Sequence, residues 1–446
     1  MADLKEIQRA IKENDIKQIR FLFVDNDGII RARSSSSGSL ENDIVSGHSY
    51  NILTPMLGNL DLINPYSRFG SVGEMRAVPD VNTFKIAPYT KQTATMICDA
   101  TTAEYEDWEL CGRTTLKRLI KESGFDVMAS FENEYYLIRE KEDGKLEPFD
   151  SSYFNSSIGM HNVNDILLDT VNSLEDQGIS VERYYCEYGP GQQEIAIKYS
   201  DALSACDNQI IFRETARSVA RNHGLLATFL PKPFNGRPAS GLHIHISLWK
   251  DGKNIFYDSN EKNTLSQTAR YFIGGILKYT QALCLFSAPI VNSYKRFIPG
   301  HWTSAYTFYG IDNREAAVRV CSSRKGIEAD SLNIEFKAAD STCNPYIALA
   351  ALIAAGMEGI KSKFDPGAPL QVDPIILSSE EREKRGIYRY PTTLQEAIAY
   401  TEKAAFFRDV FGEVFMDEYI NQKKYVWEQY SNWVSDWEVN HYANVF

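Results

Sequence analysis

The alternation of apolar and polar residues predicts mainly β-strands in the first hundred residues. The expected elements are an amphipathic helix over 3–13 and strands over 19–24, 29–33, 78–89 and 94–98. The Asp-Asn-Asp-Gly sequence at 25–28 is typical of a hairpin turn, and the polar stretch over 34–37 predicts a loop. Residues 101–112 are rich in Thr, Glu and Asp and predict a linker. The pattern therefore indicates a small β-rich domain joined to the rest of the chain.

Helical periodicity alternates with strands in the remainder of the sequence. The expected helices cover 114–122, 163–177, 200–222, 265–284, 345–360, 394–405 and 410–434. Pro345 suits the first turn of its helix, because a backbone N–H at that position would have no partner within the helix. No internal repeat is visible. The remainder is thus predicted to mix long helices with strands.

Acidic residues and histidines occur at four points where strand alternation would place them on one face of a sheet. They are Glu132 and Glu134, Glu187 and Glu194 on either side of a tight turn, His243 and His245, and Glu335 between apolar neighbours. Carboxylates held side by side repel one another by several kcal/mol at an effective dielectric constant of about 20, and a cation between them removes this cost. Each motif alone is also typical of a solvated strand face or of hydrogen-bonded core histidines. Together they predict an oxygen-rich site for Mg²⁺ or Mn²⁺.

Composition excludes several classes of partner. The 446 residues carry a net charge of −12, which disfavours nucleic acid and anionic membranes because both need clustered cations. The seven cysteines include no CxxC pair, which is typical of reduced thiols in a cytoplasmic protein. The sequence starts without an apolar signal segment, and its longest apolar run, over 346–357, is shorter than the roughly 20 residues that span a bilayer. We expect a cytoplasmic protein in which this run forms a buried helix.

Seven motifs in order make the chain similar to the glutamine synthetase family over nearly its full length. The motifs are Glu132-Asn133-Glu134, the segment from Glu187 to Glu194, Pro231-Lys232-Pro233, the segment from Ser240 to Ser247, the segment from Asn292 to Arg296, Asn313-Arg314 with Arg319, and Glu335 with Asp340 and Asn344-Pro345-Tyr346. The resemblance implies an α+β fold, with a small N-terminal β-grasp domain over 1–105 and a large catalytic domain over 106–446. It also implies a homo-oligomer, typically a dodecamer of two hexameric rings.

The resemblance implies ATP as co-substrate and two or three divalent cations, with a role for each matching residue. Glu134, Glu187 and Glu194 match a metal site near the acceptor carboxylate, and Glu132, His243 and Glu335 match one that bridges the ATP phosphates. His245 and Ser247 match nucleotide contacts, Arg314 and Arg319 match residues that hold the γ-phosphate of the nucleotide, and Arg296, Lys337 and Gly241 match the glutamate-binding region. Phosphoryl transfer to a carboxylate needs cations on both anions and guanidinium groups on the migrating group, which fits these roles. Outside this context, the arginines would be more typical of surface ion pairs.

Two acidic groups that bind ammonium in the family have no counterpart in this sequence. Trp302 follows Pro299-Gly300 where the family carries an acidic residue, and the segment over 47–54 has no carboxylate where the family has Phe-Asp-Gly-Ser-Ser. Ammonium needs charge compensation when it leaves water, whereas Trp302 offers apolar surface to an organic group. An arylamine would arrive uncharged near neutral pH and would need no carboxylate to deprotonate it. Drift of this loop without a change of substrate is the alternative interpretation.

The acyl-donor region also differs from the family pattern. Lys337 stands where the family commonly has Arg and cannot make its bidentate contact, although glutamate remains the expected donor. We therefore expect an ATP-dependent ligase that forms a γ-glutamyl amide from glutamate and an alkyl or aryl amine. It would act on small molecules, with neither nucleic acid nor a membrane as partner. Two alternatives remain: a glutamine synthetase that uses ammonia, and an inactive member with a binding or structural role. The retained metal-binding residues favour an enzyme.

Overall fold

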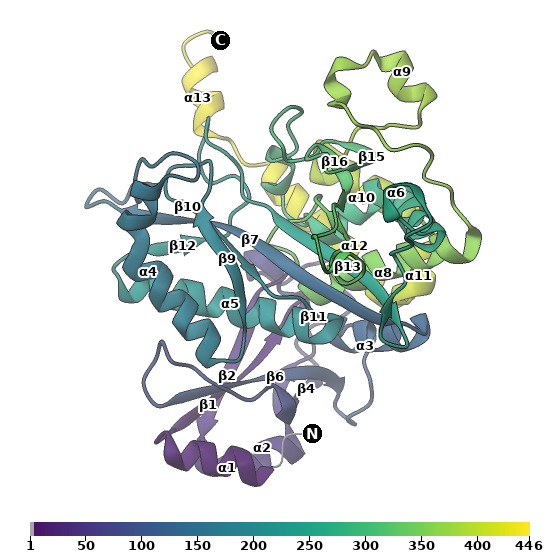
Figure 1. The fold of residues 1–446 in the computed structure, drawn as a ribbon. Helices are drawn as coiled ribbons and strands as arrows, with labels where there is room; N and C mark the ends of the chain where they lie inside the picture. Colours follow the sequence, from purple (N-terminus) through teal and green to yellow (C-terminus); the bar gives the residue numbers. More distant parts are fainter. Residues whose placement is uncertain (1–3) are drawn as a thin grey trace.

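The computed structural model describes residues 4–446, which form two β-sheets flanked by helices (Figure 1). The first sheet has the order β2-β1-β6-β4-β3, and β5 pairs with β6. Its strands are β1 (Gln18–Val24), β2 (Ile30–Ser36), β3 (His48–Asn51), β4 (Glu74–Pro79), β5 (Lys85–Ile86) and β6 (Thr93–Thr102). Helices α1 (Leu4–Glu13) and α2 (Leu40–Ser46) complete an apolar core of its own that includes Phe21, Met75 and Met96.

Strands β1 and β2 form the predicted hairpin around the turn at 25–28, and β1 also pairs in parallel with β6. Because β2 continues to Ser36, the loop predicted over 34–37 is wrong for most of its length. Residues 34–36 pair with 18–20 of β1, and this ladder uses backbone groups that serine shares with every other non-proline residue. The single strand expected over 78–89 is also wrong, because β4 ends at Pro79 and only Lys85–Ile86 returns to the sheet.

The second sheet has the order β15-β16-β17-β13-β7-β10-β9. Its strands are β7 (Asp126–Glu140), β8 (Leu146–Pro148), β9 (Val181–Cys186), β10 (Gln192–Ile197), β11 (Ser200–Asp201), β12 (Leu226–Thr228), β13 (Leu242–Lys250), β14 (Lys253–Asn254), β15 (Tyr306–Ile311), β16 (Ala316–Cys321) and β17 (Asn333–Phe336). The long strand β7 also pairs with β8, β11 and β12, and β14 pairs with β13. Neighbours along the main path are antiparallel except β15 and β16, which run parallel.

Helices cover this second sheet and confirm, with both sheets, the predicted α+β fold. They are α3 (Gly112–Ser123), α4 (Ser157–Asp176), α5 (Ala202–Asn222), α6 (Gln267–Ser287), α7 (Glu328–Ser331), α8 (Pro345–Ser362), α9 (Ser379–Lys384), α10 (Leu394–Lys403), α11 (Phe406–Phe411), α12 (Glu413–Ser431) and α13 (Asp436–Tyr442). Helix α5 packs on β7, while α6 packs on α8 and contacts β15 and β16. All residues of α8 from Pro345 to Gly356 are buried, as expected for this apolar run. Within residues 4–446, every helix is too short or too polar to cross a lipid bilayer.

The C-terminal helices differ from the single helix predicted over 410–434. Helix α11 ends at Phe411, α12 begins at Glu413, and Gly412 between them has a φ of 89°. This backbone conformation interrupts the helix and suits glycine, which has no Cβ. Beyond α12 the chain projects away from the body (Figure 1), and Trp433 and Trp437 are exposed.

The turn of the first hairpin joins the two sheets. The Asn344 side chain, which caps α8, donates a hydrogen bond to the carbonyl of Asp25 at 3.0 Å. Lys423 of α12 forms a fully buried ion pair with Asp27. A buried ion pair is costly to break, because the remaining partner would be an uncompensated charge. These contacts hold the first sheet against the helices of the second.

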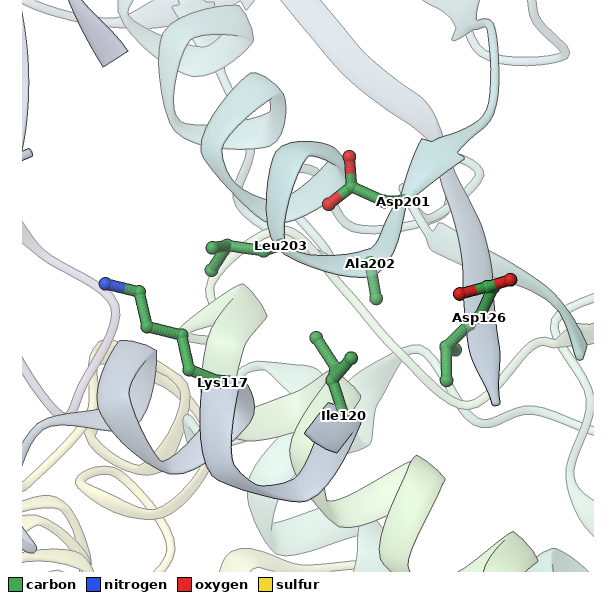
Figure 2. Close-up of a pocket in the computed structure, with 7 residues that line it drawn as sticks. Lys117, Ile120, Asp126, Asp201, Ala202 and Leu203 are labelled. Carbon is green, nitrogen blue, oxygen red and sulfur yellow. The ribbon is translucent and has the colours of Figure 1, made fainter. Parts of the chain in front are cut away.

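A hollow of about 280 Å³ lies between α3, the start of β7 and the start of α5 (Figure 2). It is lined by Lys117 and Ile120 of α3, by Asp126 and Val127, and by residues 201–203. None of the predicted site residues lines it. The hollow is therefore separate from the carboxylate and histidine motifs.

Candidate active site

Neighbouring strands of the second sheet carry most of the predicted site residues at facing positions. Arg319 on β16 faces Glu335 on β17, Glu335 faces His245 on β13, His243 faces Glu132 on β7, and Glu134 faces Glu194 on β10. Strand alternation puts these side chains on one face of the sheet. We call Glu132, His243, His245 and Glu335 the carboxylate–histidine cluster, and Glu134, Glu187 and Glu194 the acidic group.

In the carboxylate–histidine cluster, His243 lies close to both carboxylates, whereas His245 lies close to Glu132 and Asn333. His243 Nδ1 lies 3.0 Å from Glu132 Oε2 and 3.2 Å from Glu335 Oε1. His245 Nε2 lies 3.8 Å from Glu132 Oε2, and its Nδ1 lies 2.8 Å from Asn333 Oδ1. One donor atom each from Glu132, His245 and Glu335 lie within 4.8 Å of one another, a set that could hold a metal ion. The assignment of His243 rather than His245 to this set stays a prediction.

The chemistry of this set fits a divalent cation. Glu335 is fully buried, and its Oε2 accepts no hydrogen bond from residues 4–446, although Arg319 Nη1 forms an ion pair with it at 2.8 Å. Burial alone would raise the pKa of Glu335, but the charge of Lys337, with His243 and Arg319, lowers it to about 2. Burial and Lys337 lower the pKa of His243 to about 4. At neutral pH Glu335 is therefore anionic and His243 neutral, the forms that bind metals. His245 differs: burial alone would lower its pKa, but hydrogen bonds with Cys321 and Glu132 raise the pKa well above its usual value.

The acidic group shows the opposite electrostatic behaviour. Burial, with the charges of Glu132 and Glu134, raises the pKa of Glu194 to about 10. Burial and the charge of Glu187 raise the pKa of Glu134 to about 7. Carboxyls held this close favour a bound proton, and a divalent cation among them would remove the repulsion. Unlike the first set, the three donors do not all come within 4.8 Å of one another in the part of the chain that the structure describes.

Arg296 lies buried beside these residues with unused hydrogen-bond donors. Its Nη2 donates to the carbonyl of Lys337 at 2.7 Å, while Nε and Nη1 have no hydrogen-bond partner among the described residues. A buried guanidinium with free donors fits an anion such as a substrate carboxylate. A Cβ at Gly241 would come within 2.7 Å of Arg296 Nη2, so a larger residue there would require this guanidinium to shift.

The other predicted residues lie at different distances from the cluster. Arg319 reaches it from β16, whereas Arg314 is exposed in the connection between β15 and β16, and no described contact joins it to the cluster. Lys337 is buried inside the cluster, with its Nζ 3.3 Å from both Glu335 Oε1 and His243 Nε2. Ser247 follows on β13, and its hydroxyl accepts a hydrogen bond from the Trp249 indole at 2.9 Å.

Trp302 lies in an exposed loop at the edge of the acidic group. The residue is 57% exposed, and its ring makes an edge contact with Tyr188 at a centroid distance of 6.3 Å. Its backbone has a φ of 57°, and its N–H donates to the buried carboxylate of Glu315 at 2.7 Å. Because Tyr188 directly follows Glu187, this ring contact places the loop beside the acidic group.

Arg183 and Tyr185 are among the residues that contact the site but were not predicted. Arg183 donates to Glu132 Oε1 at 2.6 Å, and the Tyr185 hydroxyl donates to Glu194 Oε1 at 2.5 Å. Both lie on β9 and precede Glu187 in steps of two. Strand alternation at this segment carried the signal that would have placed them on the same face.

Comparison with known proteins identifies the family. Residues 1–108 match the glutamine synthetase N-terminal domain, and residues 109–442 match the glutamine synthetase catalytic domain. The glutamine synthetase of Methanosarcina mazei is 33% identical over 99% of this chain and 98% of its own length. That of Thermus thermophilus is 34% identical over 99% of both chains. The chain belongs to the glutamine synthetase family.

Solved structures of glutamine synthetase homologues share the fold along the whole chain. A novel glutamine synthase homologue has a TM-score of 0.84 at 28% identity and covers 97% of this chain and 99% of its own. A GmaS–ADP complex has a TM-score of 0.86 at 26% identity, with both chains covered fully. Members of the family are ATP-dependent ligases that act on small molecules and use divalent metal, and this chain is an enzyme of that class.

Proposed function

We propose that this member of the glutamine synthetase family joins glutamate to an organic amine, alkyl or aryl, in preference to ammonia. The product is a γ-glutamyl amide, formed through γ-glutamyl phosphate. One observation carries the proposal. Trp302 presents a largely exposed ring beside Tyr188, at the loop position where ammonia-using members carry an acidic residue.

The physical properties of this loop favour an amine with an apolar part. Ammonium loses hydration on entering a protein site and needs a charged partner there. The indole of Trp302 is no such partner, but it offers an aromatic surface. Apolar area of the amine that is buried against it contributes about 25 cal/mol per Å². An organic amine would thus gain binding energy where ammonium would lose it.

The remaining site residues are assigned by the groups that they could bind. One cation would be held by Glu134, Glu187 and Glu194, and another by Glu132, His243 and Glu335. The nucleotide would contact His245 and Ser247, and its γ-phosphate would contact Arg314 and Arg319. Glutamate would be bound by Arg296, Lys337 and Gly241. Bound Mg²⁺ or Mn²⁺ would neutralise phosphate and carboxylate oxygens. The buried Nε and Nη1 of Arg296, which have no hydrogen-bond partner among the described residues, support its assignment. Glu335 Oε2, which accepts no hydrogen bond there and forms an ion pair with Arg319, supports the assignment of Glu335.

The proposed reaction has two steps. A γ-carboxylate oxygen of glutamate attacks the γ-phosphorus of ATP, and the bond to ADP breaks. The amine nitrogen then attacks the acyl carbon, the C–O bond to phosphate breaks, and the nitrogen loses a proton to solvent. Arg319 would hold the migrating phosphoryl group in its fork geometry. Trp302 would keep water from the acyl phosphate, whose hydrolysis would waste ATP.

The relatives favour two candidate functions. GmaS, a gamma-glutamylmethylamide synthetase, aligns with the whole chain, which supports an organic amine. The relatives at 33% and 34% identity are named glutamine synthetase, which supports ammonia as the second candidate. An inactive scaffold is disfavoured, because it would gain nothing from like charges buried together.

Phosphate release with ATP, Mg²⁺ and glutamate tests the proposal. The amine panel contains ammonium, methylamine, longer alkylamines and arylamines, and mass spectrometry identifies each product. Replacing glutamate by aspartate controls for the acyl donor. We expect the highest kcat/KM with an organic amine. The highest value with ammonium would instead support a glutamine synthetase, and no release with any amine would support an inactive member.

We also propose the domain division and the assembly that the family resemblance implies. The N-terminal domain would cover 1–105 and the catalytic domain 106–446, with the boundary in the connection between β6 and α3. The exposed Trp433 and Trp437 support a homo-oligomer, because clustered apolar surface is typical of subunit contacts. Light scattering should give a mass twelve times that of the 50.6-kDa chain, and the mass of a single chain would contradict the dodecamer.

A further inference from the structure

Three aromatic rings from distant segments form a continuous surface at the Trp302 loop. The ring centroid of Tyr188 lies 6.3 Å from that of Trp302 and 6.1 Å from that of Phe154. We call these three residues the aromatic patch. Phe154, Tyr188 and Trp302 are 42%, 62% and 57% exposed, so packing within the chain leaves much of each ring uncovered.

The aromatic patch is directly connected to the acidic group. The Tyr188 N–H donates to Glu187 Oε2 at 2.8 Å. The ring of Tyr185, whose hydroxyl donates to Glu194 at 2.5 Å, lies 6.4 Å from the ring of Phe154. A ligand that rests on the patch would therefore have one end close to Glu187 and Glu194, where the acyl phosphate is expected to form.

Backbone hydrogen bonds hold all three segments of the aromatic patch. The Trp302 N–H donates to Glu315 at 2.7 Å. Beside Phe154, the Asn155 N–H donates to the Cys186 carbonyl at 3.1 Å, and the Glu187 N–H donates to Gln192 at 2.8 Å across the turn that carries Tyr188. A binding surface whose backbone is already ordered loses less entropy when a ligand binds.

The composition of the aromatic patch favours a flat ring over an alkyl chain. Aromatic pairs with centroids about 4.5–7 Å apart gain energy beyond the burial of apolar area. An alkylamine is protonated near pH 7 and must lose a proton before its nitrogen can attack. An arylamine is neutral at this pH, and Trp302 stands where the acidic residue that would take the proton is expected. Ring contacts and protonation state thus point to the same class of amine.

We propose that the aromatic patch is the amine subsite and that it selects a primary arylamine. This inference rests on the proposed function and names its substrate class. The aryl ring packs against Phe154, Tyr188 and Trp302, with the amino nitrogen directed toward the acidic group. The nitrogen attacks the acyl carbon, phosphate leaves with the C–O bonding electrons, and the nitrogen releases its proton to water. Tyr188 and Phe154 thereby determine specificity.

Two variants of the patch test this subsite without removing a carboxylate. Aniline, n-butylamine and ammonium serve as probes, each with ATP, Mg²⁺ and glutamate. Wild-type protein should prefer aniline. Tyr188→Ala and Phe154→Ala should each lower the ratio of kcat/KM for aniline over n-butylamine by about 5- to 30-fold, mainly through the KM of aniline, with the KM of glutamate unchanged. Tyr153→Ala is the matched control, because Tyr153 is 85% exposed and outside the patch, and its ratio should stay at the wild-type value.

The other possible results would contradict the subsite, the arylamine class or the proposed function, as follows. If aniline is preferred but both patch variants keep the wild-type ratio, the patch is not the subsite, and the proposed function stands. If the same variants also lose oligomer mass, the patch is a subunit contact. If n-butylamine is preferred to aniline, the arylamine class is wrong. If ammonium is preferred to both, the proposed function fails and this inference fails with it.

Discussion

The carboxylate–histidine cluster and the aromatic patch both adjoin the acidic group but are built in opposite ways. The cluster lies on paired strands, and Glu132, His243 and Glu335 are all buried. The patch comes from loops and turns, and its rings are roughly half exposed. Removing one charged residue of the cluster leaves its partner as an uncompensated buried charge. Replacing a side chain of the patch leaves no such charge, and it breaks no pairing between strands.

This difference separates the reaction from the choice of substrate. The strand-built cluster carries the motifs shared with glutamine synthetases, and we assign phosphoryl transfer to it. The loop that contains Trp302 departs from the family, and we assign amine selection to it. Substitutions in the cluster should therefore abolish turnover, and substitutions in the patch should redirect it.

The largest effect is expected from removing a carboxylate of the acidic group. Glu194→Ala should lower kcat by about 10³-fold or more while the oligomer stays intact, because phosphoryl transfer loses charge neutralisation. Steady-state rates and the Mn²⁺ content of the purified variant measure this. The control is Glu182→Ala on β9, which removes an exposed carboxylate paired with Arg324. Wild-type turnover and metal content in Glu194→Ala would disprove the metal role of this residue.

Arg319→Lys should have the next largest effect. Lysine keeps the charge but loses the fork geometry, so we expect kcat to fall by about 10²- to 10³-fold with a smaller change in the KM of ATP. Arg324→Lys, at an exposed arginine that pairs with Glu182, controls for the substitution itself. A raised KM with kcat unchanged would mean that Arg319 binds the nucleotide uniformly and does not act on the migrating phosphoryl group.

Trp302→Glu tests whether the loop determines the choice of amine. The ratio of kcat/KM for the best organic amine over ammonium should fall by about 5- to 150-fold, because a ring contact is lost and a carboxylate for ammonium is gained. Trp302→Phe keeps a ring and should keep most of the ratio. The same ratio in Trp302→Glu as in wild type would show that this side chain does not face the amine.

The smallest expected effect is a pH dependence of metal binding. Without a cation, Glu134 has its pKa raised to about 7, so it holds a proton below that pH that Mg²⁺ must displace. The Glu134 proton alone should therefore make the apparent Mg²⁺ affinity rise roughly tenfold between pH 6 and pH 8, and Glu194, whose pKa is raised to about 10, adds a further rise in the same direction. Calorimetric titration at each pH measures the affinity, and Glu134→Gln is the variant in which the roughly tenfold contribution of Glu134 should be lost. An apparent Mg²⁺ affinity that decreases as the pH rises would contradict this prediction.

Strand alternation was enough to predict the carboxylate–histidine cluster. Glu132, His243 and Glu335 lie in regular strands, where a period of two fixes the face on which each side chain lies. The same alternation, applied to β9, would have predicted Arg183 and Tyr185. The first hairpin and the long helices α3, α5, α6 and α8 followed from similar regularities, whereas strands such as β15 and β16 were not predicted.

Features that depend on turn geometry, or on how two strands pair, could not be predicted from strand alternation. Tyr188 and Trp302 are in contact across two irregular segments, and Trp302 has a φ of 57°, which the spacing of residues does not encode. The break between α11 and α12 at Gly412 lies inside an apparently continuous helical pattern, where a single glycine is tolerated. The burial of Lys337 between Glu335 and His243 depends on how two strands pair, not on either strand alone.

The preference for an organic amine over ammonia is tested most directly by competition in one vessel. Wild-type protein receives ATP, Mg²⁺, glutamate and equal concentrations of ammonium and an organic amine, with aniline and n-butylamine in separate runs. The ratio of γ-glutamyl amide to glutamine, measured by mass spectrometry at early times, equals the ratio of the two kcat/KM values. We predict an excess of the γ-glutamyl amide with at least one of the two amines. An excess of glutamine in both runs would contradict the proposed function.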